Sequence, residues 1–274
     1  MCMALEEGCV YGLLGRNGAG KTTLMSVLTG QNFADGGSVS VFEETVTENS
    51  QITRQMCFIR ENQKYPDEAT PASVFRSAAW LYPDWDSSLS SRLSERLDIP
   101  MSRSMKKLSR GQFSAVGVTV GLACRAPITF FDEPYLGLDA YARDIFYREL
   151  LEEISSRPRT VVISSHLIDE IASLIDHVLL LDGGKLVLDM DAESLRSSSF
   201  QVVGPYALVE DFIGGAMVIR SESLGGTTRA TIIKELSSED LTRGKMQHLE
   251  VRPTALNDLV VSLGGLRGRN QDAA

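Results

Sequence analysis

The sequence of 274 residues has little of what marks membrane, secreted or metal-holding proteins. No apolar stretch approaches the ~20 residues that a helix needs to cross a bilayer. The four cysteines, Cys2, Cys9, Cys57 and Cys124, have neither CxxC spacing nor clustering, which argues against a disulfide framework or a structural metal site. These absences are typical of a protein of the reducing cytosol whose thiols stay free.

Basic residues are also in the minority. Lys and Arg number 27 against 36 Asp and Glu, so the formal net charge is −9. A general nucleic-acid binder needs a basic face, and this balance argues against nucleic acid as a partner. The hydrophobic content of 43% is enough to bury the core of one large domain or two modest ones.

A glycine-rich segment is the most informative part of the chain. Gly15-Arg16-Asn17-Gly18-Ala19-Gly20-Lys21-Thr22 follows an apolar strand-like stretch, Tyr11 to Leu14, and precedes a helical pattern, Thr23 to Leu28. Strand, glycine turn and helix N-terminus form the context of a phosphate-binding loop. The glycines let backbone N–H groups converge on phosphate oxygens, and the helix N-terminus adds partial positive charge. We expect Lys21 to reach the β- and γ-phosphates and the Thr22 hydroxyl to bind Mg²⁺.

Two carboxylates follow a second predicted strand. Ile128 to Phe131 is an uninterrupted apolar run, typical of a central strand in a parallel sheet, and Asp132 and Glu133 come directly after it. Ligands of open α/β sheets bind at the carboxyl ends of strands. Because neighbouring strand residues point to opposite faces, we expect different roles: Asp132 as a Mg²⁺ ligand and Glu133 to polarise the attacking water. Two solvated acids capping a strand are the alternative.

A second helix N-terminus is predicted before the apolar stretch Ala115 to Cys124. Ser109 has the placement of an N-cap, so the segment Leu108-Ser109-Arg110-Gly111-Gln112 would form a second anion site. By itself this pentapeptide is weak evidence, since similar strings occur by chance in helical proteins.

One histidine also ends a predicted strand. His166 follows the apolar run Thr160 to Ile163, again at a carboxyl end. Read alone, His166 could be an ordinary surface histidine. His177 and His248 are better candidates for that role, because neither ends a motif.

The order of these segments resembles the ATP-binding subunit of an ABC transporter. The phosphate-binding loop is followed by Leu108 to Gln112, by Asp132-Glu133, by Gly137-Leu138-Asp139 and by Ser164-Ser165-His166. The resemblance covers roughly residues 9 to 196. It implies an α/β fold, that of a P-loop NTPase of ABC type with a mostly parallel sheet and a helical subdomain. It also implies ATP and Mg²⁺ as cofactors.

The resemblance assigns roles residue by residue. Gly15 to Thr22 match the Walker A loop, Ile128 to Asp132 the Walker B strand, and Leu108 to Gln112 the signature motif. Glu133 matches the catalytic glutamate and His166 the switch histidine, so these two are the expected catalytic residues. The expected nucleotide-binding residues are Gly15, Arg16, Asn17, Gly18, Ala19, Gly20, Lys21, Thr22, Thr23, Ser109, Arg110, Gly111, Gln112 and the D-loop residue Asp139, and the expected metal ligands are Thr22, Asp132 and Glu61.

In such proteins two subunits pair head to tail. Each ATP is held between the Walker A loop of one subunit and the signature helix of the other. The resemblance therefore implies a homodimer, or a heterodimer with a similar ATPase, and a separate transmembrane permease subunit. It implies a cytoplasmic location, peripheral on the inner face of the cell membrane through that permease.

Two departures from the family pattern bear on details. Family members usually have a Gln at the end of the strand before the helical subdomain, where this chain has Glu61, with Gln63 two residues later. Either residue is a candidate for that position. Fourteen residues precede Gly15, with no aromatic except Tyr11, whereas the family normally has further strands and an adenine-stacking aromatic there. Either the sequence lacks its true start or the adenine is held loosely, and we favour a truncated start.

The chain is predicted to carry a helical subdomain at about residues 66–120. Thr70-Pro71 combines an N-cap with a proline at the first helical position. Leu89, Leu93 and Leu97 recur at every fourth position, which predicts an amphipathic helix. Earlier in the chain, the turn at Asp35 to Gly37 predicts a strand from Ser38 to Phe42.

A composition shift at Ser194 to Ser199 predicts a domain boundary. We place the ABC ATP-binding domain at residues 1–198, a small α+β accessory domain at 199–266 and a disordered tail at 267–274. The accessory domain is expected to contain strands at Phe200–Val203, Ala216–Arg220, Ala230–Ile233 and His248–Val251, and a closing helix with Leu256, Leu259, Val260 and Leu263 on one face.

The sequence thus indicates an ATPase subunit that dimerises on MgATP and powers a separate membrane partner. One alternative is a soluble ABC ATPase acting on ribosomes or DNA, although ribosome-acting relatives usually hold two cassettes and DNA-repair types insert a long coiled coil. The other is a weakly catalytic module that senses nucleotide. Glu133 and His166 argue against the sensor, while the missing start and Glu61 keep it open.

Overall fold

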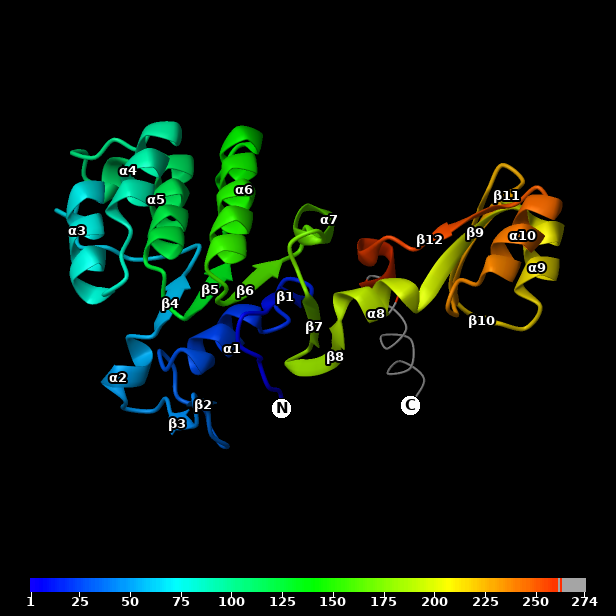
Figure 1. Cartoon of the computed structure of the whole chain (residues 1–274), viewed down its shortest axis with the longest axis horizontal. Coiled ribbons are helices and arrows are strands. Elements are labelled where there is room, and N and C mark those ends of the chain that lie inside the picture. Colours follow the sequence, from blue (N-terminus) through cyan, green and yellow to red (C-terminus); the bar gives the residue numbers. More distant parts are fainter. Residues whose placement is uncertain (261, 263–274) are drawn as a thin grey trace. The chain divides into compact units, whose positions relative to one another are not determined.

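The computed structural model describes residues 1–260 and residue 262 (Figure 1). Its contacts divide the chain into two compact units. The first comprises residues 1–166 and 181–186, and the second comprises residues 167–180 with the described residues from 187 onward. Each unit is described by itself below.

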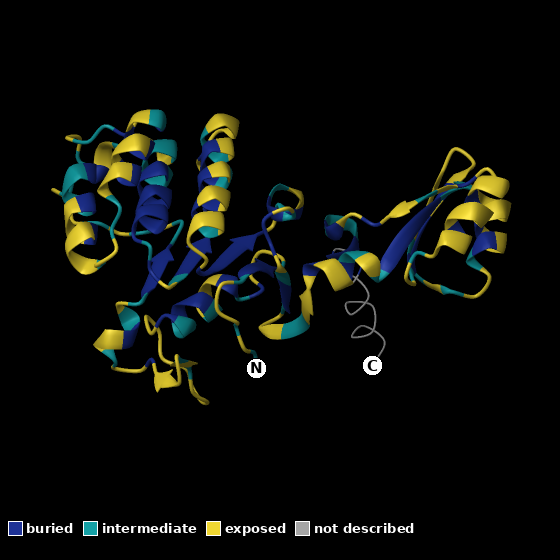
Figure 2. Ribbon diagram, in the orientation of Figure 1, coloured by how far each residue is buried: buried dark blue, intermediate teal, exposed yellow. Residues whose placement is uncertain are grey.

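The first unit is built on parallel strands. β1 (Val10–Leu14), β4 (Met56–Ile59), β5 (Ile128–Asp132) and β6 (Thr160–Ser165) pair in parallel in the order β4-β5-β6-β1. β7 (His177–Asp182) and β8 (Lys185–Asp191) follow along the chain, and each has residues in both units. Every residue of β1, β4 and β6 is buried, as apolar runs in a doubly covered parallel sheet require (Figure 2). The predicted mostly parallel α/β sheet is therefore confirmed.

Helices accompany this sheet. They are α1 (Lys21–Leu28), α2 (Ser50–Thr53), α3 (Pro71–Leu81), α4 (Ser87–Arg96), the short 3₁₀ helix η1 (Met105–Lys107), α5 (Arg110–Ala123) and α6 (Ala140–Ser156). The predicted cap at Thr70 is present: its side chain accepts from the Ser73 N–H, with Pro71 as the first helical residue. Leu89 and Leu93 of α4 are buried, as their spacing predicts.

The predicted strand from Ser38 to Phe42 is wrong in length. The structure has a two-residue strand, β2 (Ser40–Val41), paired antiparallel with β3 (Glu44–Thr45). Phe42 and Glu43 between them both have positive φ, 50° and 67°. Two such residues in succession form a tight hairpin turn, which ends the strand before Phe42.

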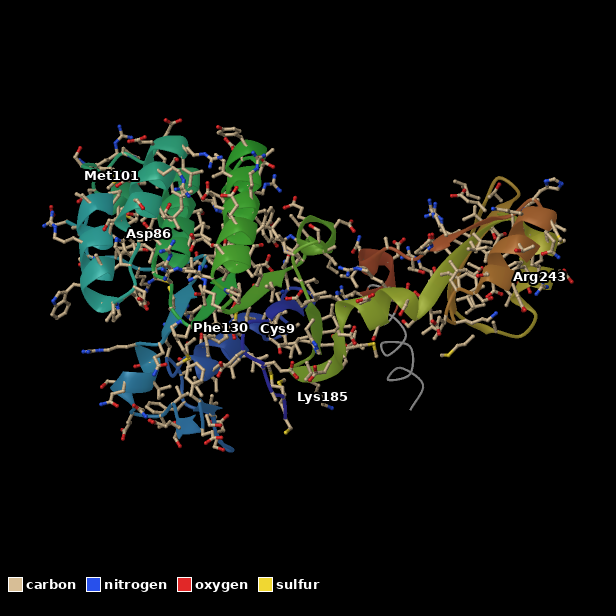
Figure 3. All side chains as sticks on the ribbon, in the orientation of Figure 1. Cys9, Asp86, Met101, Phe130, Lys185 and Arg243 are labelled. Atoms are coloured by element: carbon tan, nitrogen blue, oxygen red, sulfur yellow. The ribbon has the colours of Figure 1, made fainter. Side chains whose placement is uncertain are left out.

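Ion pairs tie α4 to α6 in the first unit. Glu149 on α6 is 2% exposed, and its carboxylate accepts from Arg92 at 2.8 Å and also from Arg96. Asp86, labelled in Figure 3, caps α4 and pairs with Arg125 at 2.6 Å. Burial alone would raise the pKa of Asp86, but its hydrogen bonds and the Arg125 guanidinium hold that pKa below its usual value.

The second unit contains a β-α-β-β-α-β arrangement. Its elements are β9 (Ser199–Pro205), α9 (Tyr206–Ile213), β10 (Met217–Leu224), β11 (Thr227–Ile233), α10 (Ser238–Met246) and β12 (Glu250–Pro253), preceded by α7 (Ile168–Ile171) and α8 (Ala192–Ser197). The sheet order is β10-β11-β9-β12 and the strands are antiparallel. This is the connectivity of a split β-α-β, ferredoxin-like unit. The residues thus form the small α+β fold that the sequence predicts.

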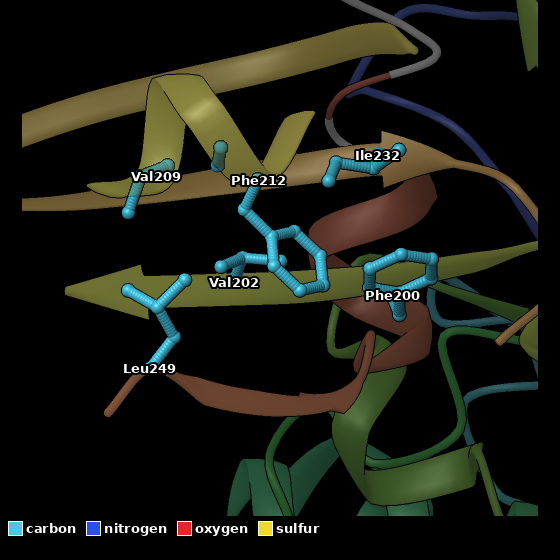
Figure 4. Close-up of a cluster of buried hydrophobic side chains, with 7 residues drawn as sticks. Phe200, Val202, Val209, Phe212, Ile232 and Leu249 are labelled. Carbon is cyan, nitrogen blue, oxygen red and sulfur yellow. The ribbon is translucent and has the colours of Figure 1, made fainter. Parts of the chain in front are cut away.

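The core of the second unit lies between this sheet and its helices (Figure 4). Its buried members are Phe200, Val202, Val209, Phe212, Ala230, Ile232 and Leu249. Arg243 of α10 lies over the Phe212 ring, 4.9 Å from its centroid. In the predicted closing helix Leu256, Leu259 and Val260 are buried, while Leu263 and the predicted tail lie outside the described residues.

Candidate nucleotide-binding and catalytic site

Three neighbouring strands bring the predicted motifs to one edge of the sheet. β5, β6 and β1 lie side by side and run in parallel, so their carboxyl ends share that edge. In register, Leu14 pairs with Ser165, and Asp132 pairs with Ser164. The phosphate-binding loop, Asp132 and His166 therefore start from adjacent positions although they are far apart in sequence.

The loop after β1 has the shape that its glycines predict. Gly15 has φ 149°, and a Cβ on it would lie 2.3 Å from the Leu181 carbonyl oxygen, so only glycine fits there. Gly20, with φ 102°, stands before the first turn of α1. Arg16, Asn17 and Gly18 are exposed, which leaves their backbone N–H groups accessible to a phosphate.

Lys21 folds back over this loop. Its ammonium donates to the Gly15 carbonyl at 2.8 Å and to the Arg16 carbonyl at 3.4 Å. The same ammonium lies 3.3 Å from Glu133 Oε1. The Lys21 side chain is only 7% exposed, so its charge is held inside the loop beside the Glu133 carboxylate.

Thr22 and Asp132 meet as the metal prediction requires. The Thr22 hydroxyl donates to Asp132 Oδ2 at 2.6 Å. The Ser164 hydroxyl donates to Asp132 Oδ1 at 2.7 Å and accepts from the Glu133 backbone N–H at 2.9 Å. Ser164 is thus a positioning residue to which the sequence reasoning gave no role. The sequence shows that Ser164 is a hydroxyl residue near the end of β6. Which residues this hydroxyl contacts depends on the order of the strands in the sheet.

Glu133 does not follow the strand alternation that was expected. β5 ends at Asp132, and Glu133 has φ 48°, in the left-handed region. Its carboxylate therefore approaches Lys21 while Asp132 approaches the adjacent Thr22, so both acids serve the same end of the loop. The prediction of opposite faces is wrong, because alternation applies only to residues with extended backbone.

His166 contacts Glu133 directly. Its Nδ1 lies 2.9 Å from Glu133 Oε2 and 2.8 Å from the Tyr135 hydroxyl oxygen. The His166 side chain is 41% exposed, whereas Tyr135 is 3% exposed. The two predicted catalytic side chains are thus in contact with each other, and Glu133 links His166 to Lys21.

The signature residues cap α5. The Ser109 hydroxyl accepts from the Gln112 N–H, and the Gln112 side chain accepts from the Ser109 N–H, each at 3.2 Å. This is a capping box, which satisfies two N-terminal donors of the helix. Arg110 pairs with Glu61 at 2.6 Å. A Cβ on Gly111 would lie 2.9 Å from the Gly137 carbonyl oxygen, so the start of α5 packs against the backbone of the segment that follows Glu133.

Asp139 and Thr23 occupy different surroundings. Asp139 is the N-cap of α6, and its side chain accepts from the Ala142 N–H at 2.8 Å. Thr23 is exposed in the first turn of α1, next to Thr22. Both residues lie at the N-terminal turn of their helix. Within the described residues, neither side chain forms a hydrogen bond with Lys21 or Glu133.

Gln63, rather than Glu61, offers an unused oxygen. Gln63 Oε1 is buried without a hydrogen-bond partner, whereas the Glu61 carboxylate is paired with Arg110. A cleft of about 530 Å³ is lined by Gln63, Glu61, Thr22 and Asp132, together with Gln31, Arg60, Asn62 and Lys64. An unsatisfied amide oxygen beside a hydroxyl and a carboxylate is the oxygen donor set that Mg²⁺ prefers, so these residues fit the metal.

Comparison with known proteins gives one consistent result. The family model described as ABC transporter matches residues 1–136. The putative ABC transporter ATP-binding protein AlbC of Bacillus subtilis is 31% identical, over 73% of this chain and 88% of its own length. The ABC transporter ATP-binding protein YtrB of the same organism is 23% identical, over 95% of this chain and 88% of its own length.

A solved structure agrees in fold. It is a dimeric, post-hydrolysis ATP-binding cassette bound to ADP and Pi, with a TM-score of 0.62 and 18% sequence identity. The match covers 69% of this chain and 88% of that one. With the Walker A, Walker B and signature segments gathered as described, the chain belongs to the ABC transporter ATP-binding proteins, a family of ATPases.

Proposed function

We propose that this chain binds MgATP, closes head to tail with a second cassette and thereby powers transport through a separate membrane subunit. The carrying observation is the contact series from Lys21 to Glu133 to His166, at 3.3 and 2.9 Å. Within this series a phosphate-binding cation, a carboxylate base and a histidine lie at one edge of the sheet. Such an arrangement suits attack of water on a γ-phosphate.

The loop and its neighbours would hold the nucleotide. Backbone N–H groups of Arg16 to Gly20 and the N-terminus of α1 would bind phosphate oxygens, and Lys21 would leave the Gly15 carbonyl to reach them. Thr22, Asp132 and Gln63 would hold Mg²⁺, with Glu61 kept by Arg110. Bound there, the metal would neutralise charge that develops on the phosphates.

Glu133 and His166 would act on the water and the γ-phosphate. A carboxylate can accept a proton from water, and Glu133 is held by Ser164 through its backbone and by His166 through Oε2. His166 is the more exposed of the pair, which suits a contact with a phosphate that arrives from solvent. Its role would be to stabilise charge on the γ-phosphate.

The signature residues would act on the second nucleotide of the dimer. Ser109 and Gly111 stand at the N-terminus of α5, a 14-residue helix whose dipole attracts anions. Gln112 and Arg110 flank them. In a head-to-tail pair this helix would face the ATP bound to the opposite Walker A loop, and Asp139 would lie in the adjoining D-loop.

The partner and location follow from the proposal. Among the described helices none is long and apolar enough to cross a membrane. We propose that a separate permease supplies the membrane path, and that the chain works on the cytoplasmic face as a homodimer or with a similar ATPase. We also propose residues 1–198 as the ATPase domain and 199–266 as an accessory domain that supports dimerisation.

Two variants separate chemistry from assembly. Glu133→Gln should bind MgATP, fail to hydrolyse it and accumulate as a closed dimer. Ser109→Arg should bind ATP as a monomer and neither dimerise nor hydrolyse, because the bulky cation replaces the capping hydroxyl at the interface. Gel filtration with and without MgATP, beside a phosphate-release assay, distinguishes the two.

The controls decide between the alternatives. Tyr141→Phe changes an exposed tyrosine at the start of α6 and should behave as wild type. If Glu133→Gln hydrolyses ATP at the wild-type rate, the assignment of the base is wrong and a nucleotide-sensing module is favoured. The full chain can also be purified from cells together with their membranes. If no membrane protein co-purifies with it, a soluble ABC ATPase is favoured instead.

A further inference from the structure

Tyr135 is the residue of this site that neither motif nor spacing singles out. It follows Glu133 by two positions, in a turn where the Leu136 N–H donates to the Glu133 carbonyl at 3.0 Å. Tyr135 is 3% exposed, yet its hydroxyl reaches the exposed His166. The two rings also meet edge to face, with their centroids 5.6 Å apart.

The hydroxyl oxygen of Tyr135 makes two contacts with the same residue. It lies 2.8 Å from His166 Nδ1 and accepts from the His166 backbone N–H at 3.2 Å. The backbone contact fixes the position of the His166 main chain, and the side-chain contact to the same oxygen fixes the rotation of the imidazole ring. Because His166 stands just after the last residue of β6, its own backbone is not held by that strand's hydrogen bonds.

The contacts also select the tautomer of His166. A carboxylate can only accept a hydrogen bond, so the 2.9 Å contact between Glu133 Oε2 and Nδ1 requires a proton on Nδ1. The Tyr135 oxygen, on the same nitrogen, can accept from that proton as well. Nε2 is then the ring nitrogen left to meet a phosphate, and it donates to a phosphate oxygen in the doubly protonated ring, because the bare Nε2 of the neutral ring is only an acceptor.

We propose that Tyr135 is a positioning residue for hydrolysis, which holds the His166 imidazole in the orientation that presents Nε2 to the γ-phosphate. The proposal rests on the catalytic roles proposed above for His166 and Glu133. Glu133 cannot hold the ring alone. Its other oxygen, Oε1, is paired with the Lys21 ammonium, and this ion pair must break when Lys21 turns to a bound phosphate, so the carboxylate can then shift. Tyr135 is fixed by its own burial.

The first test is Tyr135→Phe in the full-length chain. The ring and its packing remain, and only the hydroxyl is removed. We expect kcat for ATP hydrolysis to fall about tenfold, the size of one lost hydrogen bond in the transition state, while KM and the affinity for a fluorescent ATP analogue change less than twofold. An unchanged kcat, or an equal loss in binding and turnover, would overturn the proposal.

A matched control removes a different partly buried hydroxyl. Tyr82 donates to the Met56 carbonyl at 3.4 Å, away from His166, so Tyr82→Phe should leave kcat at the wild-type value. If Tyr82→Phe lowers kcat as much as Tyr135→Phe does, the effect is a general loss of stability and the positioning role is wrong.

Non-additivity shows whether Tyr135 acts through His166. In a His166→Ala background the hydroxyl has no ring to hold, so adding Tyr135→Phe should lower kcat no further. If the fall in kcat of the double variant equals the product of the falls in the two single variants, the proposal is contradicted. If Glu133→Gln and His166→Ala themselves keep wild-type hydrolysis, the proposed function fails; if they lose it and Tyr135→Phe does not, only the role of Tyr135 fails.

A measurement on the unmodified protein covers the case in which Tyr135→Phe does not fold. The chain has three histidines, so ¹⁵N signals of the imidazoles can be assigned with His166→Ala. We expect Nδ1 of His166 to carry the proton and Nε2 to be free of one in the neutral ring. A neutral ring protonated on Nε2 would overturn the proposal without any variant of Tyr135.

Discussion

The Lys21 ammonium lies 3.3 Å from the Glu133 carboxylate, and the two side chains are only 7% and 11% exposed. The cation that would bind phosphate is thus neutralised by the proposed general base. Lys21 is also held by the Gly15 carbonyl. A nucleotide must therefore compete with a carboxylate inside the loop for the same ammonium, and binding and base activation become linked.

From this pair we expect Glu133→Gln to tighten ATP binding as well as to stop hydrolysis. The amide removes the charge that competes for the Lys21 ammonium, and a gain of about 1.4 kcal/mol on losing this ion pair corresponds to roughly a tenfold fall in Kd. Titration with a non-hydrolysable fluorescent ATP analogue, on protein kept monomeric by dilution, measures it. Lys21→Ala should bind the analogue at least a hundredfold more weakly, because the variant loses roughly two charge-assisted hydrogen bonds from the ammonium to the phosphates. Equal Kd values for wild type and Glu133→Gln would show that the pair does not oppose binding.

Gln63 and Glu61 should differ in their effect on Mg²⁺. Gln63→Ala removes a buried oxygen that has no protein partner, so hydrolysis should need a higher Mg²⁺ concentration. Glu61→Gln breaks only the surface pair with Arg110, which contributes little, and the Mg²⁺ dependence should stay within twofold. Activity measured against free Mg²⁺ at saturating ATP compares them. The reverse ranking would return the metal role to Glu61, as the sequence alone suggested.

Gly111→Ala should impair turnover without impairing nucleotide binding. The new Cβ would lie 2.9 Å from the Gly137 carbonyl oxygen, a backbone atom that must move to make room. We expect ATP binding by the monomer to stay at the wild-type affinity, and ATP-dependent dimerisation and hydrolysis to fall at least tenfold. Gly36→Ala meets nothing within 4 Å and serves as control. Wild-type hydrolysis by Gly111→Ala would mean that this contact tolerates the shift.

Glu149→Gln should destabilise the first unit. The buried carboxylate accepts from Arg92 and Arg96 of α4, and the Arg92 pair is also seen in the raised pKa of that guanidinium. Because both arginines are partly exposed, we expect a loss of about 1–2 kcal/mol rather than the full value for a buried pair. Chemical denaturation of wild type, Glu149→Gln and the exposed-site control Glu152→Gln measures it. A loss no larger than that of the control would show that α4 and α6 are held by packing alone.

Asp240 should make the stability of the second unit depend on pH in the acid range. Burial alone would raise the pKa of this carboxyl, but hydrogen bonds from Lys234 and Ser237 outweigh it and lower the pKa. Its stabilisation is therefore complete above the unfolded-state pKa, about 3.9, and is lost as the pH falls through the lower folded-state value.

Asp240→Asn should remove that dependence. At pH 7 we expect a loss of about 1 kcal/mol, and the gap between the variant and the wild type should narrow as the pH falls below the unfolded-state pKa of about 3.9. Urea unfolding followed from pH 2.5 to 7 tests it, with the exposed carboxylate of Asp211, as Asp211→Asn, for control. A gap between wild type and Asp240→Asn that does not narrow in acid would mean that the residue stabilises by packing and not by charge.

The sequence by itself determined the local parts of the site. A phosphate-binding loop depends on residues within one strand, turn and helix, so Gly15 to Thr22 could be read without any partner. The same holds for Ser109 as the cap of α5 and for Thr70 as the cap of α3, where the hydrogen bond spans three residues. Apolar runs located β5 and β6 because buried strands of a parallel sheet need no alternation.

Only the tertiary structure decided which of these parts meet. The order β5-β6-β1 places Ser164 between Asp132 and the loop, and Thr22 reaches Asp132 across 110 positions of sequence. Periodicity reports the face on which a residue lies, not the strand that will lie beside it, so the roles of Ser164 and Tyr135 were invisible. The left-handed backbone of Glu133 was equally hidden, because the turn that imposes it is closed by contacts outside the strand.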